Sequence, residues 1–205
     1  MIERLSAAAG RDVSRETFER LKAYANLLRE GAAEQNLIAL STLDTLWERH
    51  ILDSAQLARF EPFAGASWAD VGSGAGLPGV VLALLTEGPI TLIEPRRLRA
   101  DFLQHTIEAL GIAGRVEVKP TKVERVEGKF DVITARAVAN MSKMLQLSQH
   151  LSTRKTVWAL PKGRGALAEL AEAQRAWQGV FHVEQSVTDV DSFIIVGTGV
   201  REKTR

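Results

Sequence analysis

The first sixty residues carry hydrophobic side chains at the spacing of amphipathic helices. Apolar residues recur there every three or four positions, which is the period of one helix face. The clearest such face carries Phe18, Leu21, Ala25 and Leu28. Ser14 is placed to cap this helix, and Gly31 is expected to interrupt or end it. A second helix is predicted at about residues 43–59.

After Pro62 the pattern changes to short apolar runs that alternate with amphipathic stretches. Strands are predicted at residues 67–71, 90–93, 116–118, 130–135, 156–160, 181–187 and 192–197. Helices are predicted at residues 78–85, 96–110, 140–149 and 165–178. Alternating strands and helices indicate right-handed βαβ units in a mostly parallel sheet. The last two strands are joined by only four residues, so we expect an antiparallel hairpin there.

Composition narrows the class of protein. The 205 residues are 45% hydrophobic and 25% charged, which is typical of a globular chain. No apolar run is long enough to span a membrane, and the first residues do not resemble a secretory signal, so we expect a cytoplasmic protein. Because the chain has no cysteine, thiolate zinc sites and cysteine nucleophiles are excluded. The scattered histidines predict no metal site.

Three regions are expected along the chain. Residues 1–62 are predicted to form a helical extension that packs on a catalytic domain at residues 63–200, and residues 201–205 to form a disordered tail. The formal net charge is only +1, but no acidic residue occurs between Asp131 and Glu169. The cations in this stretch are Arg136, Lys143, Arg154, Lys155, Lys162 and Arg164. They either create a local positive field or scatter over different faces.

The segment Asp70-Val-Gly-Ser-Gly-Ala-Gly-Leu-Pro-Gly79 follows a predicted strand and opens a predicted helix. Gly72, Gly74 and Gly76 permit a tight turn and a close approach of a ligand to the backbone. Positions 74–79 also match a dinucleotide fingerprint. However, the Asp70 carboxylate suits the cationic methionine end of S-adenosylmethionine and would repel a pyrophosphate. The interpretation therefore favours S-adenosylmethionine.

Two further strand ends offer cofactor contacts. Glu94 ends the second predicted strand and can accept hydrogen bonds from ribose hydroxyls, although it can also serve as an acid at the start of the next helix. Val123 and Glu124 follow the third strand, where the valine can face an adenine ring. Glu124 can equally be a surface acid beside Arg125.

Residues that the chain lacks argue against two classes of methyl acceptor. Methylation at pyrimidine C5 needs a thiolate, and exocyclic amines typically go with an Asn/Asp-Pro-Pro-aromatic loop after the fourth strand; neither is present. A ring nitrogen such as guanine N7 carries no proton and needs no general base. By exclusion, the sequence favours an N7-type acceptor.

Basic residues follow the fourth and fifth strands. Arg136 is the best candidate for positioning a substrate, by contact with phosphate or with guanine O6, unless it only pairs with Asp131 or another acid. Lys162 and Arg164 are candidates for phosphate contact or are solvated loop residues. His50 and Asp53 share a helix face and could, with Asn36, cover the site or form a structural hydrogen bond.

Several motifs together resemble the bacterial 16S ribosomal RNA guanine-N7 methyltransferase family, also called glucose-inhibited division protein B. The resemblance covers roughly residues 18–198 and rests on Asn36-Leu-Ile, Arg49-His-Ile-Leu-Asp-Ser54, Asp70 to Gly79, Ala135-Arg-Ala-Val-Ala139 and Leu160-Pro-Lys-Gly163. It implies a class I methyltransferase fold with a seven-stranded sheet. It also implies S-adenosylmethionine as cofactor, held by Gly72, Leu77, Glu94, Val123, Glu124 and Arg136.

The implied substrate is one guanine in the 530 loop of 16S ribosomal RNA, free or within the small subunit, modified by a monomeric enzyme. Three other functions fit the residues. They are a methyltransferase of the same fold acting on a small molecule or protein, a nicotinamide-dependent oxidoreductase, and a non-catalytic RNA-binding protein.

Overall fold

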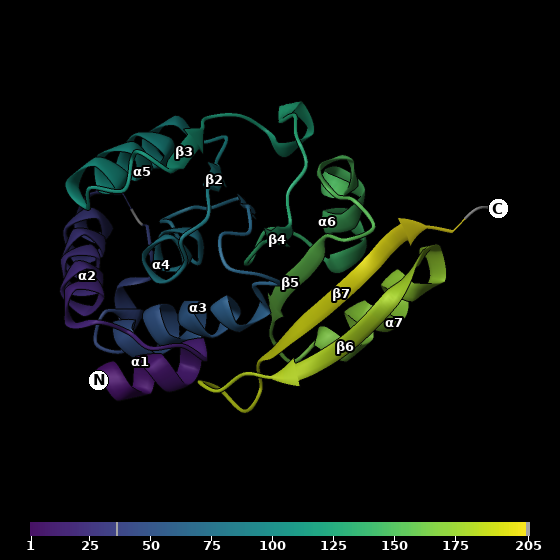
Figure 1. The fold of residues 1–205 in the computed structure, drawn as a ribbon, viewed down its shortest axis with the longest axis horizontal. Coiled ribbons are helices and arrows are strands. Elements are labelled where there is room, and N and C mark those ends of the chain that lie inside the picture. The colour runs from purple at the N-terminus through teal and green to yellow at the C-terminus, as the bar shows by residue number, and fades with distance from the viewer. Residues whose placement is uncertain (36, 204–205) are drawn as a thin grey trace.

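The computed structural model describes residues 1–35 and 37–203. Its centre is one sheet in the order β3-β2-β1-β4-β5-β7-β6 (Figure 1). The strands are β1 Trp68–Val71, β2 Ile90–Ile93, β3 Val116–Lys119, β4 Val132–Thr134, β5 Val157–Lys162, β6 Trp177–Gln185 and β7 Phe193–Glu202. β1 to β5 are parallel, and β7 runs antiparallel to both β5 and β6. The predicted sheet with its terminal hairpin is confirmed.

Helices cover both faces of the sheet. The α-helices are α1 Ile2–Ala9, α2 Arg15–Gln35, α3 Asp53–Ala55, α4 Gly79–Leu85, α5 Arg97–Ala109, α6 Met141–Ser148 and α7 Ala166–Ala176. Short helical turns occur at η1 Leu40–Thr42, η2 Trp47–Leu52, η3 Gln56–Phe60, η4 Val123–Arg125 and η5 Gln149–Leu151. The Ser14 hydroxyl accepts the amide of Thr17 at 3.0 Å at the start of α2, as the sequence predicts.

Two hydrophobic cores lie on opposite faces, because side chains alternate along each strand. Trp68 and Val132 face a core that also contains α1, α2, α4 and α5. Ala69 and Ile133 face the other core, which α6 and α7 complete. The amino-terminal helices thus share the first core with the sheet, and Figure 1 shows them at one end, opposite the β6–β7 hairpin.

The amino-terminal helices differ from the prediction in two places. Gly31 does not end α2, which continues to Gln35. It is required by packing instead, since a Cβ there would lie 2.9 Å from Phe102 Cε2 of α5 and would also meet the Leu37 side chain. The helix predicted at about residues 43–59 is present as a helical segment at residues 47–60, which changes its hydrogen-bond pattern from a π-helical turn (η2) through α3 to η3. Side-chain periodicity does not distinguish these turns from one continuous helix.

The carboxyl-terminal end also differs from the prediction. Trp177 and Gln178 begin β6 rather than ending α7, and they pair with Glu202 and Arg201 of β7. The Lys203 amide then donates to the Ala176 carbonyl at 2.8 Å. The expectation of disorder is therefore wrong for residues 201–203, because a neighbouring strand supplies their backbone partners. In the part of the chain that the structure describes, no helix is long and apolar enough to cross a membrane.

We predict that Gly31→Ala destabilises the chain although alanine is the better helix former. The added methyl meets Phe102 in a filled interface, and overpacking of this kind costs about 1–3 kcal/mol, more than the roughly 1 kcal/mol gained in helix propensity. Urea unfolding measures the difference. Gly114→Ala is the control because a Cβ at Gly114 meets no atom within 4 Å. An equal or higher stability for Gly31→Ala contradicts the packing argument.

Candidate active site

A buried carboxylate anchors the glycine loop at the end of β1. Asp70 is 1% exposed, and its Oδ2 accepts the backbone amide of Gly79 at 3.0 Å, at the start of α4. Its Oδ1 is buried and has no hydrogen-bond partner within the described chain. The Ser73 hydroxyl donates to the backbone carbonyl of Asp70 at 2.9 Å and does not satisfy Oδ1. Burial raises the pKa of Asp70 to about 6.

A second buried carboxylate holds the tip of the same loop. Glu94, at the end of β2, accepts the amide of Gly74 at 2.9 Å and that of Arg96 at 2.8 Å. The Arg96 bond lies directly before α5, so Glu94 does act at this helix start, the alternative role considered from the sequence. Each carboxylate oxygen retains a further lone pair for a ligand. The backbone turns at Gly72 and Gly74, with φ values of 68° and 58°.

A pocket of about 350 Å³ opens beside this loop. We call it the donor pocket; its walls include Gly72, Glu94, Val123, Glu124, Ala137 and Val138. The structure therefore brings together four of the residues expected to bind a cofactor. Gly76 and Leu77 are buried behind the loop, and their contact with a cofactor stays a prediction.

The sequence analysis missed Tyr24 on α2, the only tyrosine in the chain. Its hydroxyl donates to the Ala75 carbonyl in the glycine loop at 2.8 Å, and the side chain is fully buried. Burial raises the pKa of Tyr24, which keeps the phenol protonated as a donor. The sequence could have indicated this role. Tyr24 lies between Leu21 and Leu28 on the apolar face of α2, which predicts burial, and a buried phenol needs a hydrogen-bond partner.

Arg136 lies just past β4, between two further pockets of about 320 Å³ and 460 Å³. The larger one, which we call the helix-side pocket, is lined by Thr42, Arg49, His50, Asp53, Arg136, Ala137, Thr188, Asp189 and Ser192. Ala137 lines all three pockets, so the donor pocket and the helix-side pocket share this residue.

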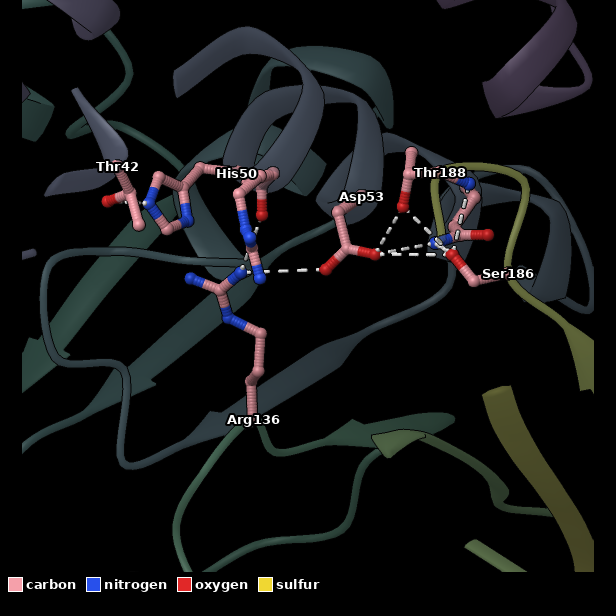
Figure 2. Close-up of polar contacts among 8 residues, drawn as sticks. Thr42, His50, Asp53, Arg136, Ser186 and Thr188 are labelled. Atoms are coloured by element: carbon pink, nitrogen blue, oxygen red, sulfur yellow. Dashed lines mark hydrogen bonds and ion pairs between the residues drawn. The ribbon is translucent and has the colours of Figure 1, made fainter. Parts of the chain in front are cut away.

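Arg136 pairs with Asp53 and not with Asp131. Its Nη1 lies 3.5 Å from Asp53 Oδ2 and 3.5 Å from the Arg49 carbonyl oxygen (Figure 2). Asp131 instead accepts hydrogen bonds from the amide and hydroxyl of Ser67 at 2.8 Å and 2.7 Å. Both contacts of Arg136 are long, so the guanidinium is held weakly.

Asp53 also connects the amino-terminal helices to the β6–β7 loop. Its Oδ1 accepts hydrogen bonds from Gln56 Nε2 and from the Thr188 hydroxyl, both at 2.9 Å (Figure 2). The Gln56 amide group also donates to the Ser186 hydroxyl at 3.0 Å and accepts the Val187 amide at 3.0 Å. The β6–β7 loop is thereby fixed as a wall of the helix-side pocket.

His50 bonds to Thr42 rather than to Asp53, as Figure 2 shows, so the hydrogen bond considered between His50 and Asp53 is not formed. Nε2 lies 2.9 Å from the Thr42 hydroxyl oxygen. Burial, together with the charges of Arg136 and Arg49, lowers the pKa of His50 to about 4, so the ring is neutral at pH 7. Asn36, the third residue considered for this cover, lies outside the described residues.

The two cationic side chains that follow the predicted fifth strand, Lys162 and Arg164, already have partners within the protein. Lys162 Nζ donates to the Ala139 carbonyl at 2.9 Å and pairs with Glu169 at 2.8 Å. Arg164 is exposed and pairs with Asp191 at 2.7 Å. Arg154 and Lys155 precede β5 and so lie at the opposite edge of the sheet. The run of cations is therefore dispersed by the fold, and phosphate contact by Lys162 or Arg164 stays a prediction.

The sequence matches one known protein family over most of its length. A family model for the rRNA small subunit methyltransferase G, GidB, matches residues 17–193. The chain belongs to this family. A methyltransferase G of Zymomonas mobilis subsp. mobilis is 46% identical over 93% of the chain and 90% of its own length. One of Paracoccus denitrificans is 38% identical over 92% of the chain and 98% of its own length.

Solved structures show that the chain shares its fold with methyltransferases. A SAM dependent methyltransferase from Aquifex aeolicus superposes with a TM-score of 0.60 at 15% identity, covering 76% of the chain and 93% of that structure. The ribosomal protein L11 methylase of Lactobacillus delbrueckii subsp. bulgaricus gives a TM-score of 0.59 at 14% identity, covering 76% and 79%. The likeness confirms the predicted class I methyltransferase fold.

We predict that Asp70→Asn changes how stability depends on pH. Because the folded-state pKa is raised from 3.8 to about 6, the stabilisation from the neutral carboxyl is complete below pH 3.8 and is lost as pH rises through 6. Asparagine stays neutral and still accepts the Gly79 amide. Between pH 4 and 7, wild type should lose about 2–3 kcal/mol relative to the variant.

Urea unfolding at a series of pH values measures this difference. Asp12→Asn, at an exposed position, controls for the loss of one carboxylate. Parallel stability profiles for wild type and Asp70→Asn would show that the buried Asp70 carboxyl does not titrate as described.

Proposed function

We propose that the chain transfers a methyl group from S-adenosylmethionine to the N7 of a guanine in 16S ribosomal RNA. The observation that carries this proposal is the donor pocket beside a glycine loop, together with a buried oxygen of Asp70, Oδ1, that has no hydrogen-bond partner among the described residues. Membership of the rRNA small subunit methyltransferase G family supports the same assignment. Following the resemblance, the target is the guanine of the 530 loop.

The residues around the donor pocket fit S-adenosylmethionine. Asp70 Oδ1 is a buried acceptor without a partner, suited to the ammonium of the methionine end. Glu94 retains lone pairs for the two ribose hydroxyls, and Val123 offers an apolar wall for the adenine ring. Arg136 would bind the carboxylate of the methionine end. When bound, the cofactor supplies an electrophilic methyl group on a sulfonium.

The chain contributes positioning rather than proton transfer. Guanine N7 has a free lone pair, so no residue has to remove a proton before attack. His50 is neutral at pH 7 and is not needed as a base. The work of the site is to hold the base in line with the methyl group and to exclude water. Ala137, at the junction of the pockets, marks where the two reactants would meet.

The RNA is expected to reach the site from the side of the β6–β7 loop. Arg164 is exposed there, and its ion pair with Asp191 is a surface pair that phosphate can replace at small cost. Lys162 is mostly buried, and its main role would be to hold the segment after β4 in place. We further propose a monomeric cytoplasmic enzyme, with residues 1–62 as its helical extension and residues 63–200 as its methyltransferase domain.

We predict that Glu94→Gln weakens binding of S-adenosylmethionine about 10- to 100-fold. Glutamine keeps only one acceptor oxygen, and its amide N–H groups would face the backbone amide of Gly74 or Arg96. A charge-assisted hydrogen bond to a ribose hydroxyl is worth about 1.5–3 kcal/mol, which corresponds to this range. Isothermal titration calorimetry measures the dissociation constant.

Glu127→Gln is the matched control for Glu94→Gln. Glu127 is exposed and does not line the donor pocket. An unchanged affinity in a folded Glu94→Gln protein would remove Glu94 from the cofactor site.

The acceptor atom is tested by replacing guanine N7 itself. Small-subunit RNA with 7-deazaguanosine at the target position keeps the Watson–Crick edge but has a C–H group in place of N7. With labelled S-adenosylmethionine, we expect transfer to unmodified RNA and to small-subunit particles, and at least 100-fold less transfer to the 7-deaza RNA. Equal labelling of both RNAs would place the methyl group on another atom.

A further inference from the structure

One ring nitrogen of His50 has a fixed role. The Thr42 hydroxyl donates its only proton to the Ala39 carbonyl at 2.7 Å, and His50 Nε2 lies 2.9 Å from the same hydroxyl oxygen. In the tautomer that keeps both of these bonds, Nε2 carries the proton and donates to Thr42. In a neutral imidazole, the other nitrogen then has only a lone pair. His50 Nδ1 is thus a hydrogen-bond acceptor.

This acceptor has no partner among the described residues. Nδ1 is buried, and leaving a buried acceptor unsatisfied carries an energetic penalty. Burial, and after it the positive charges of Arg136 and Arg49, lower the pKa of the ring, so the acceptor is maintained at neutral pH. A ligand with an N–H group is the complement that such an atom requires.

A second acceptor lies against the same guanidinium. Asp53 Oδ2 is 3.5 Å from Arg136 Nη1, and Figure 2 shows Arg136 reaching up between His50 and Asp53. Both residues line the helix-side pocket, whose volume of about 460 Å³ is in the range of ligand sites. Since its contacts with Asp53 and the Arg49 carbonyl are long, Arg136 can turn aside at little cost.

Guanine carries the matching donors. Its N1–H and 2-amino groups form a cyclic guanidine unit, so this edge of the base resembles the arginine group that lies 3.5 Å from Asp53 Oδ2. The 2-amino group lies on the opposite side of the bicycle from N7. Because Ala137 lines both pockets, a base with N7 toward the donor pocket can place its N1–H and 2-amino edge in the helix-side pocket.

We propose that His50 Nδ1 and Asp53 Oδ2 select the target base by accepting hydrogen bonds from the N1–H and 2-amino groups of guanine. The inference rests on the proposed function and adds the residues that distinguish guanine from adenine. Adenine presents a lone pair at N1 and a C–H group at C2, so neither acceptor would find a donor. The selectivity arises because a buried acceptor left unpaired penalises the wrong base.

The test measures base preference in wild type, His50→Phe and His50→Asn. Three small-subunit RNAs are compared, with guanosine, inosine or adenosine at the target position; inosine lacks the 2-amino group, and adenosine also lacks N1–H. Phenylalanine keeps the ring but has no acceptor, whereas an asparagine oxygen can occupy the place of Nδ1. His105→Phe, at an exposed position on α5, is the control.

For His50→Phe we expect the preference for guanosine over inosine or over adenosine to fall about 10-fold or more, while His50→Asn and His105→Phe retain it. The preference is measured both as a ratio of RNA dissociation constants without turnover and as a ratio of kcat/KM. Unchanged ratios in a folded His50→Phe protein overturn the inference. If wild type instead transfers no methyl group to guanine N7, the proposed function itself fails.

Discussion

Two buried carboxylates hold the loop on which the rest of the site depends. Asp70 and Glu94 stand at the ends of the neighbouring parallel strands β1 and β2, and they accept the amides of Gly79 and Gly74 at opposite ends of the loop. These hydrogen bonds restrict the backbone of the loop and so help to set the shape of the donor pocket. The remaining oxygen of Asp70 is unsatisfied, so binding energy is available where a cation would lie.

The segment after β4 lies between the donor pocket and the pockets beside Arg136, which under the proposed function are a donor side and an acceptor side. Ala137, with a φ of 56°, lines the donor pocket and both pockets beside Arg136. The acceptor side is completed by parts of the chain that are distant in sequence, since Asp53 binds both Arg136 and Thr188. The amino-terminal helices and the β6–β7 loop are therefore walls of the site, and α2 supports its floor through Tyr24.

Local patterns were enough to predict the sheet and the convergence of strand-end residues on one pocket. Alternating apolar strands and amphipathic helices leave few topologies, because crossovers are right-handed and short links require hairpins. Parallel strands place their carboxyl ends at one edge, so residues that follow successive strands, such as Gly72, Glu94 and Val123, converge without knowledge of long-range contacts. The glycine spacing and the preceding acid are likewise encoded within ten residues.

Only the tertiary structure shows which residues that lie far apart in the sequence contact one another. The sequence does not show that Arg136 meets Asp53, that Lys162 is committed to Glu169, or that residues after 200 extend β7. The glycine at position 31 is a further example. It is required because a side chain there would collide with Phe102, a contact that the sequence does not show. The sequence by itself determined which chemical groups stand at the ends of the strands. Which of those groups are neutralised, buried or left without a partner depends on segments brought together by packing, and no local pattern records that proximity.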